Sequence, residues 1–139
     1  MEIKVREVRK KSITKPEDVA KILQDILKVE DKYDQDKEHF WVLGLNSRNV
    51  LQYLELVSLG SLNASLVHPR EVFRLSVHKA VASLIVAHNH PSGETEPSRE
   101  DLEITKRLKE AGKILGIEVL DHIIITRTEY ISFTEKNLI

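Results

Sequence analysis

The sequence has no cysteine among its 139 residues. Disulfide bonds, thiolate nucleophiles and cysteine-ligated zinc sites are therefore excluded, and so are the zinc deaminases, whose signature requires cysteines. A chain without disulfides fits a reducing compartment. There is also no apolar run near the roughly 20 residues of a membrane-spanning helix, and no apolar stretch of a secretory signal. We therefore expect a cytoplasmic protein that does not span a membrane.

Neither sign of charge is in surplus. Lys and Arg number 21 and Asp and Glu number 22, so the formal net charge is −1. Direct nucleic-acid binding is not supported by this balance, because proteins that bind phosphates non-specifically usually carry a basic surplus. The basic residues within 4–11 are expected to form a solvated N-terminal segment, with a phosphate-contacting patch as the alternative. The length and a hydrophobic content of 41% suit one domain with one core.

Apolar periodicity predicts three helical regions. A helix over residues 12–28, which Ser12 or Thr14 would cap, is indicated by apolar residues at helical spacing: Val19, Ile22, Leu23, Ile26 and Leu27. A short helix is expected over 69–80. A third helix is predicted over 98–116, capped by Ser98 and ended by Gly116, with a core face formed by Leu102, Leu108, Ala111 and Leu115.

Apolar and β-branched runs predict the strands. Residues 82–88 are the best candidate for the central strand, because this short run is apolar throughout. Further strands are predicted over 1–8 (an edge strand), 39–46 and 50–60 (a hairpin), 117–126 and 130–133. This order predicts an α/β sandwich, a mixed central β-sheet with helices packed on its faces. We expect an N-terminal segment over 1–11 and a single domain over 12–139.

The stretch AHNHPSGETEPSRED, residues 87–101, directly follows the predicted central strand. His88 and His90 alternate on an extended backbone, so their side chains can point the same way, and Asp101 can add a carboxylate oxygen from the next helix. Two imidazole nitrogens and one carboxylate leave a fourth position open, as in catalytic zinc sites rather than closed structural ones. This ligand set suits Zn²⁺ best, at one ion per chain.

The same stretch also has a purely structural interpretation. Ser98 and Asp101 have the spacing of a helix capping box, and the prolines and glycine between the two groups are turn formers. Either histidine could hydrogen-bond the loop. This interpretation gives no reason for two histidines at the end of an apolar strand, and the metal site is therefore favoured.

The spacing His-x-His, seven residues, Ser, two residues, Asp resembles the JAMM signature of JAB/MPN-type metalloproteases. The longer string HNHPSGETEPSREDLEITKRL is more similar still to the bacterial RadC family, as are HPREVFR and LGIEVLDHIIIT. The resemblance runs from about residue 12 to the C-terminus. It implies an MPN/JAB-like fold for the domain over 12–139.

The resemblance also implies roles for five residues. His88, His90 and Asp101 would be the metal ligands. The family pattern needs a glutamate at the entry to the first core strand, and Glu38 in KEHFWVLGLN matches that place; it would be the general base toward the water on the metal. Ser98 would steady that water or the developing oxyanion. The implied reaction is hydrolysis of a peptide or isopeptide bond.

Two histidines outside the motif have structural interpretations. His39 alternates with Glu38 and should therefore face the other side of the sheet. His122 is expected to form a structural pair with Asp121 in a strand. The alternative is that Asp121 or His122 holds the second ring nitrogen of a ligand histidine, because such ligands normally have an outer partner.

The resemblance does not supply a substrate. The RadC family is linked by name to DNA repair, and its long members carry an N-terminal helix-hairpin-helix domain for which this chain has no room, so we expect a short form. The alternative to an enzyme is a non-catalytic MPN scaffold that holds a metal in a DNA-processing or mobile-element complex. An exposed strand edge at either terminus would allow a homodimer.

Overall fold

The computed structural model describes residues 4–6, 11–60 and 67–139. Its centre is a six-stranded mixed sheet with the strand order β1-β3-β2-β4-β5-β6, in which β4 and β5 run parallel and the other neighbours run antiparallel. The strands are β1 (Lys4–Arg6), β2 (Glu38–Leu45), β3 (Leu51–Gly60), β4 (Ser83–Asn89), β5 (Glu118–Ile125) and β6 (Tyr130–Ser132). The helices are α1 (Pro16–Lys28), α2 (Lys32–Gln35), α3 (Pro69–Val72), α4 (Arg74–His78) and α5 (Arg99–Leu115).

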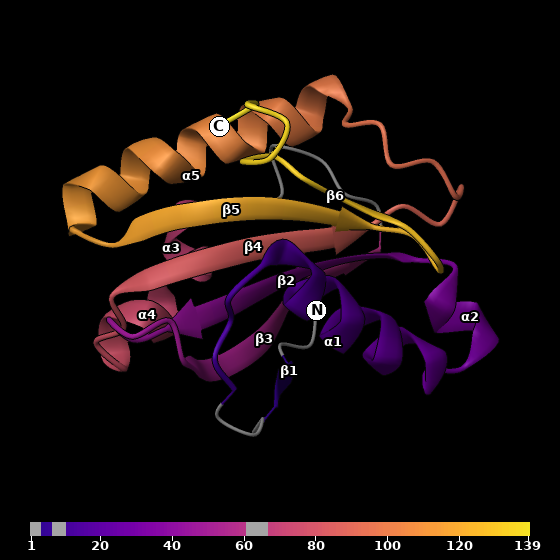
Figure 1. The fold of residues 1–139 in the computed structure, drawn as a ribbon, viewed down its shortest axis with the longest axis horizontal. Coiled ribbons are helices and arrows are strands. Elements are labelled where there is room, and N and C mark those ends of the chain that lie inside the picture. Colours follow the sequence, from indigo (N-terminus) through magenta and orange to yellow (C-terminus); the bar gives the residue numbers. More distant parts are fainter. Residues whose placement is uncertain (1–3, 7–10, 61–66) are drawn as a thin grey trace.

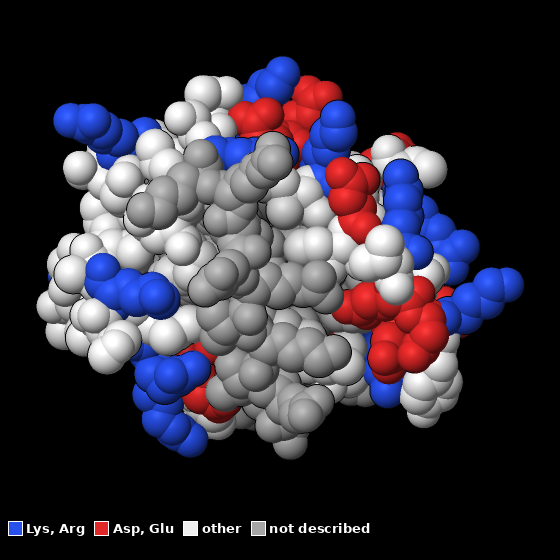
Figure 2. Space-filling view, turned by 90° about the horizontal axis from the view of Figure 1, so that it is seen from below, with Lys and Arg blue, Asp and Glu red and all other residues white. Residues whose placement is uncertain are grey.

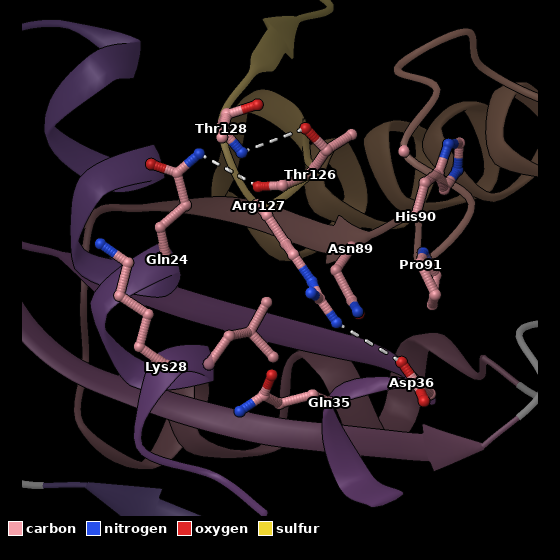
Figure 3. Close-up of a pocket in the computed structure, with 12 residues that line it drawn as sticks. Gln24, Lys28, Gln35, Asp36, Asn89, His90, Pro91, Thr126, Arg127 and Thr128 are labelled. Carbon is pink, nitrogen blue, oxygen red and sulfur yellow. Dashed lines mark hydrogen bonds and ion pairs between the residues drawn. The ribbon is translucent and has the colours of Figure 1, made fainter. Parts of the chain in front are cut away.

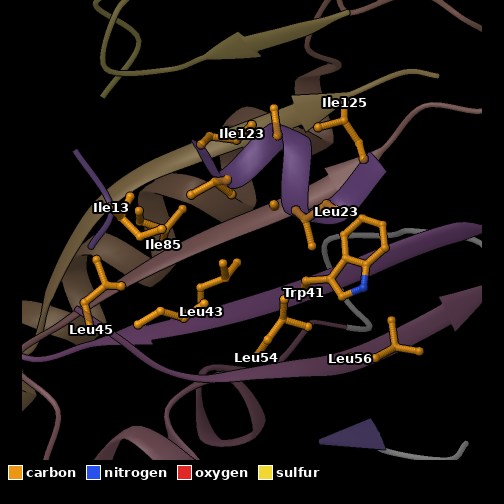
Figure 4. Packing of buried hydrophobic residues seen from close by; sticks show 14 of the residues in the cluster. Ile13, Leu23, Trp41, Leu43, Leu45, Leu54, Leu56, Ile85, Ile123 and Ile125 are labelled. Atoms are coloured by element: carbon orange, nitrogen blue, oxygen red, sulfur yellow. The ribbon is translucent and has the colours of Figure 1, made fainter. Parts of the chain in front are cut away.

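Helices cover both faces of this sheet, and each face has its own core (Figure 1). The helix α1 packs its buried apolar residues against one face, where Trp41, Leu43, Ile85 and Ile123 form the centre of the cluster (Figure 4). On the other face, α3, α4 and α5 pack against a second cluster. Alternation along each strand separates the two sets, because successive side chains point to opposite faces. The predicted α/β sandwich is therefore confirmed.

The predicted strands are present, and the central position of β4 is confirmed because it lies between β2 and β5. The predicted hairpin of residues 39–46 and 50–60 is the antiparallel pair β2–β3. The predicted edge strand is represented by β1 at one edge of the sheet, and residues 1–3 and 7–8 of that prediction lie outside the described part of the chain.

The predicted caps of α1 are wrong. The helix begins after Lys15, and neither Ser12 nor Thr14 caps it through its side chain. Instead the carboxylate of Asp18, one turn into the helix, accepts hydrogen bonds from the backbone N–H groups of Thr14 and Lys15, at 2.9 and 3.1 Å. These bonds hold the pKa of Asp18 below its ordinary value. An acidic side chain in the first turn therefore fixes the backbone just before the helix, and its negative charge lies at the positive end of the helix dipole.

The predicted core face of α5 is half wrong. Leu102 and Leu115 are 40% and 48% exposed, whereas Leu108 is buried as predicted. The buried stripe instead runs through Asp101, Ile104, Thr105, Leu108 and Gly112. Two polar residues occupy the first turns of this stripe, so a search for apolar spacing assigns the wrong face. The helix ends at Gly116 as predicted, in the left-handed conformation that favours glycine (φ 72°).

Two helical regions also differ from prediction. The short helix α2 lies within a stretch that had no predicted element, and Asp31 caps it by accepting from the backbone N–H of Asp34 at 2.8 Å. The single helix predicted over 69–80 is divided into α3 and α4, with Phe73 between them. Within the described ranges, no helix has the length and apolar character to cross a membrane.

Charged side chains of both signs lie side by side on the surface. Figure 2 shows Lys and Arg next to Asp and Glu around the described rim of one face. Neither sign covers this part of the surface alone, as expected for a chain with a net charge of −1.

Candidate metal centre

The strand β4 carries the first predicted ligand to the centre of the molecule. Phe40 of β2 is paired with His88 of β4, so the two side chains lie on the same face of the sheet, the face that α5 covers. Continuing this antiparallel register by two residues places Glu38 across from His90. The turn after β4 and the first turn of α5 then bring Asp101 to the same place.

The structure brings the three predicted ligands together. His88 Nε2 lies 2.9 Å from His90 Nε2 and 3.1 Å from Asp101 Oδ1, and His90 Nε2 lies 3.1 Å from Asp101 Oδ2. One ligand atom from each residue can be chosen so that all three lie within 4.8 Å of one another. Bonds of 2.0–2.1 Å to a tetrahedral zinc would set ligand atoms about 3.3 Å apart. The three side chains can therefore hold a metal ion with small adjustments.

Asp101 is held by the helix cap that was considered as the alternative to a metal site. The backbone N–H of Ser98 donates to Asp101 Oδ2 at 2.8 Å, and the backbone N–H of Asp101 donates to Ser98 Oγ at 3.1 Å. Cap and metal group are thus not exclusive, because the cap orients the same carboxylate that faces the histidines. Burial opposes ionisation of Asp101, but its bonds to His88 and His90 outweigh burial and hold its pKa well below the ordinary value.

The loop fixes the orientation of the His90 ring. His90 Nδ1 lies 2.8 Å from the backbone carbonyl oxygen of Glu94. A carbonyl can only accept, so Nδ1 carries the hydrogen and Nε2 faces the other two ligands. The chain folds back at Gly93, whose φ of 91° suits glycine. The turn at Gly93 thus brings the Glu94 carbonyl to His90 Nδ1, and this contact leaves Nε2 facing the site.

Metal affinity is expected to depend steeply on pH through His90. Burial lowers the pKa of His90, but the carboxylate of Asp101 and the carbonyl of Glu94 outweigh burial and raise it above the ordinary value. A metal must displace that proton. Below the pKa of His90, metal affinity should fall about tenfold per pH unit, and it should level off above it. Competition titrations with a chelator between pH 6 and 8.5 measure this slope. An affinity that is flat across the range would contradict a proton held at His90.

Glu38 and Ser98 lie in the same cleft as the ligands. Glu38, His90, Ser98 and Asp101 all line one hollow beside the N-terminal end of α5. Ser98 is exposed, and its Oγ accepts the cap hydrogen bond, which leaves its own hydrogen available to a bound molecule. The four predicted groups are therefore arranged around one opening.

Asn89 brackets Glu38, which the sequence did not indicate. Its Oδ1 accepts from the backbone N–H of His39 at 2.6 Å, and its Nδ2 donates to the backbone carbonyl of Lys37 at 3.0 Å. The side chain of Asn89, which stands between the two ligand histidines in sequence, thus fixes the backbone on both sides of Glu38. In the sequence, alternation indicates only that the Asn89 side chain points away from the face shared by His88 and His90.

His39 faces away from the site, as predicted. Its ring stacks on Trp41 at 5.0 Å, on the α1 side of the sheet, and its Nε2 lies 2.6 Å from the carboxylate of Glu30.

Asp121 and His122 form the predicted structural pair through the backbone of His122 and not through its ring. The Asp121 carboxylate accepts from Ser132 Oγ at 2.5 Å and from the backbone N–H of His122 at 2.8 Å, but it does not contact the His122 ring. The ring instead lies against His88, with 2.7 Å between His122 Nε2 and His88 Nδ1. Burial, and then the neighbouring His88, lower the pKa of His122 well below the ordinary value. His122 therefore lies where the alternative prediction placed it, beside the second ring nitrogen of the predicted ligand His88.

A second hollow, of about 480 Å³, adjoins His90 on its other side (Figure 3). It is lined by α1, by the end of α2 and by the β5–β6 turn. Figure 3 shows Arg127 of that turn reaching to Asp36, at 3.7 Å. Both side chains are largely exposed, so this ion pair contributes little stability.

Comparison with known proteins finds one matching family model and relatives of about 50% identity. The family model described as "RadC-like JAB domain" matches residues 13–138. A UPF0758 protein of Caldanaerobacter subterraneus subsp. tengcongensis is 53% identical over 125 residues, which are 90% of this chain and 52% of the relative. UPF0758 proteins of Desulforamulus reducens and Bacillus cereus (strain G9842) are each 50% identical, over 89% and 90% of this chain and 52% and 53% of the relative. The chain thus spans about half the length of these curated relatives.

Proposed function

The chain belongs to the family of RadC-like JAB domains, and we propose that it is a zinc-dependent hydrolase of peptide or isopeptide bonds. The observation that carries this proposal is that His88, His90 and Asp101 converge, and that His90 and Asp101 share a hollow with Glu38 and Ser98. A scaffold needs only the three ligands. An acid and a hydroxyl in the same cleft are the groups that amide hydrolysis needs in addition.

The ligand set suits a catalytic zinc ion. His88 Nε2, His90 Nε2 and one oxygen of Asp101 would hold it, and nitrogen ligands with a single carboxylate favour zinc over magnesium or calcium. Three protein ligands leave one position open. When bound, the metal would supply Lewis acidity, which lowers the pKa of water from 15.7 to about 7 and polarises the substrate carbonyl.

Glu38 and Ser98 would carry the proton transfer and the charge stabilisation. Glu38 would take a proton from the attacking water and deliver it to the nitrogen of the leaving amine, as a general base and then a general acid. Ser98 would donate its hydroxyl hydrogen to the oxyanion that develops on the carbonyl oxygen, an effect on the order of 2.7–4 kcal/mol where such donors have been removed.

The hollow beside His90 offers room for the substrate chain. Its size falls within the range of roughly 300–1,000 Å³ that ligand sites occupy. Gln24 of α1 donates to the backbone carbonyl of Thr126 at one side of it (Figure 3), and Lys28 and Gln35 also line it, so backbone groups of a peptide would meet both donors and acceptors. The near-neutral charge of the chain favours a peptide over a nucleic acid as the substrate.

A cleavage assay with and without metal tests this function. The purified chain is depleted of metal, reloaded with one equivalent of zinc, and incubated with a mixture of fluorogenic peptides and lysine-linked isopeptides. Cleavage by the reloaded protein that stops on chelation and returns with zinc is the expected result. No cleavage of any substrate by the zinc-loaded protein, or cleavage that chelation leaves unchanged, would contradict the proposal.

Replacing Asn89 by alanine should slow hydrolysis without removing the metal. The variant loses both hydrogen bonds that bracket Glu38, and displacement of a catalytic group by about 1 Å can cost on the order of 100-fold in rate. We expect kcat to fall by about 10- to 100-fold with zinc content unchanged. Steady-state kinetics and metal analysis on the same sample measure both quantities.

Asn46→Ala is the matched control for Asn89→Ala. Asn46 also uses its side-chain oxygen to accept from backbone N–H groups, those of Arg48 and Val50, but it does so in the turn between β2 and β3. It should lose stability and keep kcat. Equal losses of kcat in the two variants would show that Asn89 acts only through stability.

A further inference from the structure

A line of hydrogen bonds joins two of the predicted metal ligands, His88 and Asp101, through His122 and Thr105. His122 Nε2 lies 2.7 Å from His88 Nδ1, and His122 Nδ1 lies 2.5 Å from Thr105 Oγ1. Thr105 Oγ1 in turn donates to the backbone carbonyl oxygen of Asp101 at 2.8 Å. All four residues are buried. The line thus begins at the backbone of one predicted ligand and ends at the ring of another.

The carbonyl of Asp101 sets the direction of every hydrogen in this line. A carbonyl oxygen only accepts, so the single hydroxyl hydrogen of Thr105 points to it. The free lone pairs of Thr105 Oγ1 then face His122 Nδ1, which must carry a hydrogen. Within the described part of the chain, the His122 ring hydrogen-bonds to His88 and Thr105 and to no carboxylate, and a neutral imidazole has one N–H only. His122 Nε2 therefore presents a lone pair to His88.

The ring of His122 is also held mechanically. Phe133 stacks on it with ring centres 4.4 Å apart, and Phe40 meets it edge-on at 6.0 Å. Rotation of the imidazole would have to displace both rings in a closely packed interior. The two ring nitrogens are therefore fixed in their assignments, one to Thr105 and one to His88.

We propose that His122 and Thr105 are positioning residues that keep the proton of His88 on Nδ1, so that His88 Nε2 presents a bare lone pair to the metal. This inference rests on the metal site of the proposed function. The backbone carbonyl of Glu94 likewise keeps a hydrogen of His90 on Nδ1, so that His90 Nε2 faces the site. Both histidines then turn Nε2 toward each other, 2.9 Å apart, and toward the Asp101 carboxylate. A metal ion that displaces the proton of His90 would meet all three groups there.

Imidazole nitrogen spectra of the metal-free protein test the direction of the line. Long-range ¹⁵N–¹H correlation distinguishes a ring that carries its hydrogen on Nδ1 from one that carries it on Nε2. Both His88 and His122 should carry it on Nδ1 in the wild-type protein. A hydrogen on Nε2 of either ring would overturn the proposal. This experiment uses no metal, so its outcome is independent of whether the chain is a hydrolase.

Thr105→Val removes the hydroxyl and keeps the shape of the side chain. His122 then has no acceptor at Nδ1 and can move its hydrogen to Nε2, which reverses the hydrogen bond to His88. We expect the His88 hydrogen to shift toward Nε2 and zinc affinity to fall by about 10- to 100-fold, the usual effect of losing an outer partner. Thr105→Ser restores the hydroxyl and should restore both readouts.

Ser132→Ala is the control for general destabilisation. Ser132 is buried on the neighbouring strand and donates to Asp121, outside the line. It should lose stability and keep both the His88 tautomer and the zinc affinity. If Thr105→Val bound zinc as tightly as Thr105→Ser, or lost no more affinity than Ser132→Ala, the proposal would be wrong. If the wild type bound no zinc but showed the expected tautomers, the proposed zinc hydrolase would be contradicted, whereas the proposed direction of the hydrogen bonds would be supported.

Discussion

Replacing Glu38 by glutamine is expected to abolish hydrolysis while the metal stays bound. The amide cannot take a proton from the attacking water, and general acid–base catalysis typically contributes about 10²–10⁴-fold to the rate. Glu38 is not one of the three residues that can hold the ion, so zinc content should remain at the wild-type level. Single-turnover rates and elemental analysis of the same preparation measure the two quantities.

Glu96→Gln is the matched control for Glu38→Gln. Glu96 lines the same cleft, and its replacement by glutamine removes the same charge, but Glu96 is an exposed residue of the loop before α5. Its kcat should remain within about twofold of wild type, in line with the small effects of most surface substitutions. If Glu38→Gln lost its zinc, Glu38 would be a ligand rather than the base. If it kept full activity, another group would have to carry the proton.

Replacing Asp101 by alanine is expected to remove both the metal and part of the fold's stability. The carboxylate faces both histidines and also accepts from the Ser98 backbone. Zinc affinity should fall by more than the roughly 10- to 100-fold that loss of an outer partner costs. The metal-free protein should also lose about 1 kcal/mol of its free energy of unfolding, as helices do when an N-terminal cap is removed. Zinc titration and urea unfolding measure the two losses.

Ser98→Ala separates the two roles of Asp101. This variant loses the hydroxyl that accepts from the Asp101 backbone but keeps the carboxylate. It should be destabilised by a similar amount, about 1 kcal/mol, and still bind zinc. If Ser98→Ala lost zinc as completely as Asp101→Ala, the cap alone would account for the effect on the metal.

The features that the sequence predicted well are those that depend on local geometry. Alternation places His88 and His90 on the same side of an extended segment, and the fixed start of α5 at Ser98 places Asp101 one turn inside the helix. Apolar and β-branched runs also predicted the strands, and helical spacing with a cap at each end predicted the bounds of α5. Only the family resemblance selected Glu38 among many nearby acids, because its position depends on the register between β2 and β4.

The features that the sequence did not predict depend on contacts between distant segments. Thr105 and His122 are 17 positions apart, and Asn89 and His39 are 50 apart; no spacing along the chain reveals such pairs. The buried face of α5 was missed for the same reason. Polar residues are buried there because they meet the histidines of β4 and β5, and they interrupt the apolar stripe that would otherwise identify the face.

The cap and the metal site had been opposing interpretations of one loop, and the structure contains the geometry of both. Asp101 caps α5 with the same carboxylate that faces the histidines. A capping box places an acidic side chain in the first helical turn at a defined orientation. A helix start beside the end of a central strand is therefore an efficient way to hold one ligand in register with two others.

The metal content of the purified, untagged protein is the measurement to make first. Elemental mass spectrometry is run on the wild type and on His88→Ala, each as isolated and after incubation with zinc and removal of the excess. We predict about one zinc ion per chain in the wild type and little or none in His88→Ala. No bound metal in the wild type even after incubation, or the same zinc content in both proteins, would contradict a metal centre at His88, His90 and Asp101.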